Sequence, residues 1–151
     1  MHVVLFQPEI PPNTGNVARL CAAMQVSLHL IEPLGFKLED RYLKRAGLDY
    51  WPHVDMAVWP GLDAYLRNAG AGRRLVLTSA RRGVALHRFA FTENDSLVFG
   101  RETSGLPPEV IGLSPHHVRI PIKGEVRSIN LSTAAGIVLF QALVSAGLVG
   151  E

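Results

Sequence analysis

The C-terminal segment places the strongest constraint on the fold of this chain. From Ser128 to Gly150 the sequence contains no charged residue, a length that could cross a bilayer. A helix that is apolar on all sides is also typical of a buried core or a subunit interface. No basic flank follows the segment, and polar residues interrupt it. We therefore expect a helix buried in the core or in an interface and no membrane span; the interrupting residues are Asn130, Ser132, Thr133, Gln141 and Ser145.

Short apolar runs and amphipathic stretches alternate along the rest of the chain. Periodicity predicts strands at 3–6, 27–31, 54–59, 75–78, 97–99 and 118–122 and helices at 14–24, 38–46, 62–68 and 107–111. Asn13 or Thr14 is the expected cap of the first helix. The alternation favours an α/β fold, with a mainly parallel sheet covered by helices on both faces. A length of 151 residues fits one domain, over 1–151.

Composition excludes some classes of site and leaves others open. The single cysteine, Cys21, precludes an internal disulfide and a cysteine-built metal site, and its apolar neighbours predict burial. The N-terminus enters a strand without a basic leader, so we expect a cytoplasmic protein. We also expect that the protein holds no metal. The net charge of +2 and pI of about 9.0 permit RNA binding without requiring it. The positive charges occur in pairs: Lys44-Arg45, Arg73-Arg74, Arg81-Arg82 and His87-Arg88.

Three loops follow predicted strands and would meet at one edge of the sheet. They are 77–79, 100–107 and 122–128, and ligands collect at the carboxyl ends of such strands. Gly100 and Gly105 permit a close backbone approach to a ligand. The helix start at 128–132 offers free backbone N–H groups. Each loop alone could be an ordinary turn, but together the three loops predict a cofactor site. Neither a dinucleotide fingerprint nor a P-loop motif is present, so the sequence does not support binding of a dinucleotide or of a P-loop nucleotide.

Three segments resemble the ordered motifs of SPOUT-class RNA ribose methyltransferases. They are 12–19 (PNTGNVAR), 98–107 (VFGRETSGLP) and 119–132 (RIPIKGEVRSINLS). The similarity is greatest to the small single-domain tRNA 2′-O-methyltransferases, and agreement at 9–12, 31–36 and 45–50 extends it over nearly the whole chain. The resemblance implies a C-terminal trefoil knot (the α/β-knot), a homodimer and S-adenosylmethionine as the cofactor. The uncharged tail would then close the knot and supply the dimer contact.

The resemblance also implies roles for individual residues. In the family the counterpart of Arg19 is essential, and a general-base role has been attributed to it. A guanidinium stays protonated, so we expect Arg19 to grip a phosphate and favour the developing alkoxide. The remaining catalytic candidates, which would orient the nucleotide, are Asn13, Glu102, Ser128 and Asn130. The cofactor-binding candidates are Leu77, Thr78, Gly100, Glu102, Gly105, Ile120, Ile122, Ser128, Leu131 and Ser132.

The implied reaction is methylation of the ribose 2′-hydroxyl of the wobble (position 34) cytidine or uridine in tRNA, with S-adenosylhomocysteine as the product. RNA contacts would come from the arginine pairs and from Tyr50 and Trp51, which can stack on unpaired bases. Burial of these two aromatic residues is an equal alternative. Two other functions remain open: ribosomal RNA 2′-O-methylation, and RNA binding without catalysis.

Overall fold

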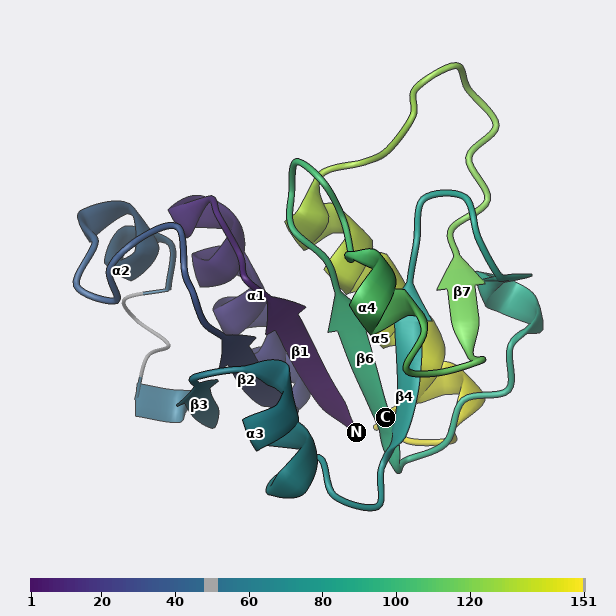
Figure 1. Ribbon diagram of the computed structural model, residues 1–151, viewed down its shortest axis with the longest axis horizontal. Helices are drawn as coiled ribbons and strands as arrows, with labels where there is room; N and C mark the ends of the chain where they lie inside the picture. Colours follow the sequence, from purple (N-terminus) through teal and green to yellow (C-terminus); the bar gives the residue numbers. More distant parts are fainter. Residues whose placement is uncertain (48–51, 151) are drawn as a thin grey trace.

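The computed structural model describes residues 1–47 and 52–150, which contain seven strands in one parallel sheet. The strand order is β3-β2-β1-β6-β4-β7-β5 (Figure 1). Every neighbouring pair is parallel, as the alternating sequence pattern predicts. The strands are β1 (His2–Phe6), β2 (Ser27–Ile31), β3 (Met56–Trp59), β4 (Arg74–Thr78), β5 (Val84–Ala85), β6 (Asp95–Phe99) and β7 (His117–Arg119).

Helices cover both faces of the sheet, because successive strand residues point to opposite sides. Val3 and Leu5 of β1 pack with α1 (Pro11–Met24) and α5 (Leu131–Ser145). Val4 and Phe6 lie in a second core with α3 (Leu62–Arg67) and α4 (Pro108–Ile111). Figure 1 shows α3 and α4 in front of the sheet and α1 and α5 behind it. Two further helices are α2 (Arg41–Gly47) and the 3₁₀ helix η2 (Leu86–Arg88).

Several predicted boundaries were wrong for identifiable reasons. Helix α1 begins at Pro11, because prolines fit the first helical positions, where no N–H partner is needed. Asn13 and Thr14 are therefore inside the helix and do not cap it. Helix α2 begins later than predicted, where Asp40 Oδ1 accepts hydrogen bonds from the backbone of Tyr42 and Leu43. The two-residue strand β5 was not predicted, and β7 ends at Arg119.

Most of the uncharged segment forms helix α5, which has a buried face and an exposed face. Asn130 Oδ1 caps it by accepting from the backbone of Ser132 at 2.9 Å and of Thr133 at 3.4 Å. One face packs into the core through Ala135, Val138, Leu139, Ala142 and Leu143. The other leaves Ile137, Phe140 and Val144 between 43% and 51% exposed. Among the described residues no helix is both long and apolar enough to cross a membrane.

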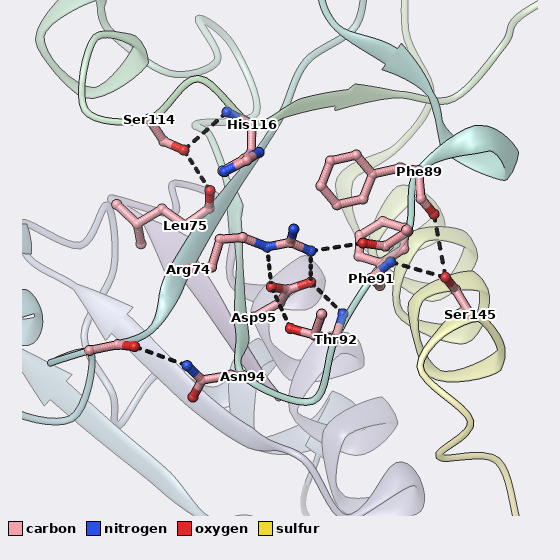
Figure 2. Close-up of polar contacts among 12 residues, drawn as sticks. Arg74, Leu75, Phe89, Phe91, Thr92, Asn94, Asp95, Ser114, His116 and Ser145 are labelled. Atoms are coloured by element: carbon pink, nitrogen blue, oxygen red, sulfur yellow. Dashed lines mark hydrogen bonds and ion pairs between the residues drawn. The ribbon is translucent and has the colours of Figure 1, made fainter.

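An ion pair joins the starts of β4 and β6 (Figure 2). Arg74 donates from Nε and Nη2 to the two carboxylate oxygens of Asp95, at 2.7 and 2.8 Å. Asp95 is fully buried and also accepts from the backbone and hydroxyl of Thr92. Arg74 Nη2 donates to the Ala90 carbonyl as well, at 2.8 Å. The sequence predicts that the Arg73-Arg74 pair contacts RNA. The structure instead places the Arg74 guanidinium in this ion pair, which corrects that prediction for Arg74.

Replacing Asp95 with asparagine should lower the free energy of unfolding by about 2–4 kcal/mol, since it leaves a half-buried guanidinium without its charge partner. Burial alone would raise the pKa of Asp95, but the bonds from Arg74 and Thr92 bring it below its ordinary value of 3.8. The contribution is therefore present above that pH and lost as the pH falls through the lower folded pKa. Urea denaturation measures the change.

The matched control is Asp63→Asn, which breaks the exposed 3.3 Å pair with Arg67 within α3. Exposed pairs contribute roughly 0–1 kcal/mol, so this variant should unfold almost like the wild type. Equal effects of the two substitutions would show that burial of the Arg74–Asp95 pair adds nothing.

A buried aromatic cluster contains two histidines, His2 and His29. The Trp59 indole N–H donates to His29 Nδ1 at 3.0 Å, and Tyr65 Oη bonds to His2 Nδ1 at 2.8 Å. Tyr65 Oη also bonds to Ser96 Oγ at 2.7 Å. Burial, with the neighbouring positive charges, lowers the pKa of each histidine to about 4. Both imidazoles are therefore neutral in the folded protein at neutral pH.

Acidification from pH 6.5 to 4 should destabilise the protein progressively. Histidines in the unfolded chain take up protons near pH 6.5, whereas these two stay neutral in the folded protein until about pH 4. Their contribution to the free energy of unfolding is therefore fully present above pH 6.5 and is lost as the pH falls toward 4. The slope should reach at most about 1.4 kcal/mol per pH unit for each histidine. Urea titrations at several pH values test this, and His2→Phe should reduce the slope. A wild-type stability that stays constant across this range would contradict the neutral assignment.

Candidate functional site

A cavity of about 760 Å³ opens at the carboxyl ends of β4, β6 and β7. Its wall combines Thr78 and Ser79 at the end of β4, the 100–106 loop after β6 and residues 127–131, which lead into α5. Ile10 and Asn13, at the start of α1, complete it. This is the edge of the sheet where the sequence predicts a ligand site. The connections that form it rise above the strand ends at the top of Figure 1.

Most of the predicted site residues lie in this wall. Leu77 and Ser132 do not line the cavity, although each is adjacent in sequence to a lining residue. Leu77 is fully buried in the core beneath α3 and α4. Arg19 is exposed on α1 and is also absent from the lining. The predicted residues in the wall are Asn13, Thr78, Gly100, Glu102, Gly105, Ile120, Ile122, Ser128, Asn130 and Leu131.

The loop after β6 folds back on itself across the cavity. Arg101 and Gly105 exchange backbone hydrogen bonds of 3.2 and 2.9 Å. Gly105 has a φ of +68°, a conformation that favours glycine. A Cβ on Gly100 would lie only 2.3 Å from the Gly105 carbonyl carbon and 2.4 Å from the Leu106 nitrogen. The two glycines are therefore needed for different reasons: Gly105 for its backbone angle and Gly100 for close packing of the loop.

Glu102 binds the beginning of α1 through its carboxylate. Its oxygens accept from the backbone N–H groups of Glu9 at 2.9 Å and Ile10 at 2.6 Å, and from Asn13 Nδ2 at 3.5 Å. In return, Glu9 Oε1 accepts from the backbone and hydroxyl of Thr103, at 3.0 and 2.8 Å. These bonds hold the pKa of the Glu9 carboxylate below its ordinary value. We call the three residues Glu9, Glu102 and Thr103 the reciprocal clasp, because each loop supplies a carboxylate to the backbone of the other.

Asn13 and Asn130 extend this network to the third segment. Asn130 Nδ2 donates to Asn13 Oδ1 at 3.0 Å, while Asn130 Oδ1 caps α5. One line of hydrogen bonds thus joins Glu102, Asn13 and Asn130, which belong to three different segments of the sequence. The segments 12–19, 98–107 and 119–132 converge at this cavity.

The cavity suits a small organic cofactor. Its volume falls in the usual range for ligand pockets, roughly 300–1,000 Å³. Leu106, Ile120, Ile122 and Val138 supply apolar wall, while loop backbone and side chains supply polar groups. Within 1–47 and 52–150, no three His, Cys, Asp or Glu side chains gather in a way that could hold a metal ion. Among the lining residues outside the predicted loops and motif segments are Ala80, His117 and Val138, which carry no motif of their own.

Comparison with known proteins identifies a family whose model matches most of the chain. The model of the SpoU rRNA Methylase family matches residues 1–140. The chain belongs to the SpoU family. The resemblance of the three segments to RNA ribose methyltransferases is thereby confirmed.

Relatives within the family match the chain along almost its whole length. A tRNA (cytidine(34)-2′-O)-methyltransferase from Methylovorus glucosotrophus is 48% identical over 142 residues, covering 93% of this chain and 92% of the relative. A tRNA (cytidine(34)-2′-O)-methyltransferase from Burkholderia ambifaria is 45% identical over 152 residues, covering 99% of this chain and 97% of the relative.

Solved structures extend the similarity to the fold. One, which concerns 2′-OH methylation of C/U34 on tRNA, superposes with a TM-score of 0.91 at 48% identity, covering 95% of this chain and 94% of the other. An AdoMet-bound rRNA methyltransferase from Sinorhizobium meliloti superposes with a TM-score of 0.88 at 25% identity, covering 99% of this chain and 57% of the other. The chain therefore has the α/β-knot fold of SPOUT proteins, which confirms the predicted fold class.

Proposed function

We propose that this protein transfers a methyl group from S-adenosylmethionine to the ribose 2′-hydroxyl of the wobble cytidine or uridine (position 34) of tRNA. The observation that carries the proposal is the convergence of three family segments on one cavity of about 760 Å³. Relatives that share 45–48% identity over nearly full length are tRNA (cytidine(34)-2′-O)-methyltransferases. A tRNA substrate also favours a cytoplasmic location.

The cavity residues fit a cofactor of this kind. When bound, S-adenosylmethionine supplies an already activated methyl group on a sulfonium, so the protein mainly has to align the attacking ribose oxygen. The 100–106 loop, Ile120, Ile122 and Leu131 would hold the cofactor. Structures of AdoMet-bound SpoU methyltransferases support this choice of cofactor.

Asn13 and Asn130 are proposed to orient the target nucleotide at the cavity. Their mutual hydrogen bond and the α5 cap fix both amides, so neither pays a large entropic cost on binding. Glu102 uses its carboxylate on the backbone of Glu9 and Ile10, and so acts as a positioning residue. Arg19 does not line the cavity of its own chain, and it is proposed to contact the RNA.

Two copies of the chain are proposed to associate through the exposed face of α5. Ile137, Phe140 and Val144 form this uncharged face, and Leu148 and Val149 follow it, both more than 40% exposed. Burying such a patch against a second copy would remove it from water. Sedimentation equilibrium should give twice the chain mass of 16.5 kDa, and Phe140→Asp should shift it toward the single-chain value. A monomer at micromolar concentration would contradict the proposal.

Methyl transfer to defined RNAs tests the function directly. The protein is incubated with S-adenosylmethionine and either tRNA that lacks the position-34 methyl group or ribosomal RNA. Mass spectrometry of the anticodon fragments should show one added methyl group on nucleotide 34. Methylation of ribosomal RNA alone would favour the ribosomal alternative, and binding of tRNA without methylation would favour a non-catalytic RNA-binding protein.

A further inference from the structure

A second, smaller hollow of about 430 Å³ lies beside the cofactor cavity. Three arginines contribute to its lining: Arg81 from the β4–β5 connection, Arg119 at the end of β7 and Arg127 from the segment before α5. It shares part of its wall with the cavity, so the two spaces are neighbours. The shared residues are Ala80, Arg81, Ile120, Ile122 and Arg127.

The hollow has an excess of positive charge. Glu125 is the one acidic residue among its described lining, against three guanidinium groups. Arg81 and Arg127 are exposed, and in the part of the chain that the structure describes neither guanidinium has a hydrogen bond or an ion pair. Their donors are therefore available to an anionic ligand.

The backbone that carries these arginines is fixed by local bonds. Ser79 Oγ accepts from the backbone N–H of Arg81 at 3.2 Å and of Arg82 at 3.1 Å. Arg119 Nη1 donates to the Gly83 carbonyl. Gly83 packs so closely on β7 that a Cβ there would lie 2.1 Å from the His117 carbonyl oxygen. The β4–β5 connection is thus bound to β7, and it presents Arg81 at a set position.

We propose that this hollow binds a backbone phosphate of the RNA strand next to the methylated ribose. This inference rests on the proposed function. A strand whose ribose enters the cavity carries a phosphate on each side of that ribose, and the wall shared by the two spaces puts the hollow within reach of one of them. The planar guanidinium fork matches phosphate geometry, and such contacts position a nucleic acid without reading its bases. The arginine pair 81–82 was expected to contact RNA, and the structure adds Arg119 and Arg127 from distant segments.

The double variant Arg81→Gln/Arg127→Gln tests the inference. Its affinity for tRNA that lacks the position-34 methyl group is measured in the presence of S-adenosylhomocysteine at several salt concentrations. The dissociation constant should rise about tenfold or more. The slope of log affinity against log salt should decrease by about 1–2, because fewer counterions are released when phosphate contacts are lost. Arg119 is left intact, since its side chain also holds Gly83.

Arg67→Gln is the matched control, since it removes an exposed arginine from α3. Its guanidinium pairs with Asp63 on the same helix, so the fold and the salt slope should stay as in the wild type. Thermal unfolding confirms that all variants are folded. Calorimetric titration with S-adenosylmethionine measures separately what the double variant does to the cofactor cavity, whose wall includes both arginines.

The results separate the inference from the proposed function. A wild type that methylates tRNA, together with a double variant that binds tRNA with unchanged affinity and salt slope, overturns the phosphate site alone. A double variant that loses cofactor affinity but keeps the tRNA salt slope also overturns it, because the hollow would then serve the cofactor. A wild type that does not bind tRNA overturns both.

Discussion

The Gly100→Ala variant is expected to lose roughly tenfold to a hundredfold in affinity for S-adenosylmethionine, the equivalent of about 1–3 kcal/mol of overpacking. The added Cβ would meet the backbone of Gly105 and Leu106 at 2.3–2.4 Å, and no side-chain rotation can relieve that contact. The 100–106 loop must move, and it forms one wall of the cavity. The sequence predicts that a substitution at Gly100 obstructs the ligand directly, whereas in the structure the added Cβ meets the loop backbone first. Isothermal titration calorimetry measures the loss.

Gly124→Ala is the matched control for this experiment. It adds the same methyl group at a glycine whose Cβ position has no atom within 4 Å, in the segment that follows β7. Its cofactor affinity should equal that of the wild type. If Gly100→Ala also binds the cofactor normally, the 100–106 loop is not a wall of the cofactor site.

The Arg19→Ala variant is expected to lose at least about a hundredfold in the rate of methyl transfer to tRNA, with cofactor affinity changed by less than about threefold. Arg19 is exposed on α1 and does not line the cavity of its own chain, so it should contact the RNA and not the cofactor. A guanidinium stays protonated and can stabilise a phosphate or a developing alkoxide. Single-turnover assays measure the rate, and calorimetry measures cofactor binding.

Arg67→Ala removes the same charge from an exposed position on α3 and should methylate tRNA at the wild-type rate. An Arg19→Ala enzyme with normal turnover would exclude Arg19 from the mechanism. Loss of cofactor affinity in that variant would instead place the guanidinium in the cofactor site.

The parallel sheet could be predicted from sequence because buried strands are short apolar runs separated by helical patterns. The runs at 3–6, 27–31 and 75–78 all lie within observed strands. Local patterns failed where tertiary contacts decide the structure. The strand β5 has two residues, too few for a period, and exists because β7 provides its partner. The knot came from the family resemblance, since hydrophobic periodicity does not report the path of the chain.

The site could be predicted in part for the same reason. Glycines and polar residues after strands mark the loops that meet at one edge, so Gly100, Gly105 and Asn130 were identified. Contacts between distant segments leave no local pattern: the pairing of Arg74 with Asp95 and the position of Leu77 beneath the site required the structure. Tyr50 and Trp51, expected to stack on RNA bases, lie outside the described residues, and their role stays a prediction.

The reciprocal clasp of Glu9, Glu102 and Thr103 couples the opening of the 100–106 loop to that of the segment before α1. Each loop holds backbone amides of the other through a carboxylate, so neither can open without releasing bonds in both. Amide hydrogen exchange at residues 9, 10 and 103 should therefore be governed by a shared opening event. A ligand that contacts only the 100–106 loop would then slow exchange at the start of α1, on the other side of the clasp.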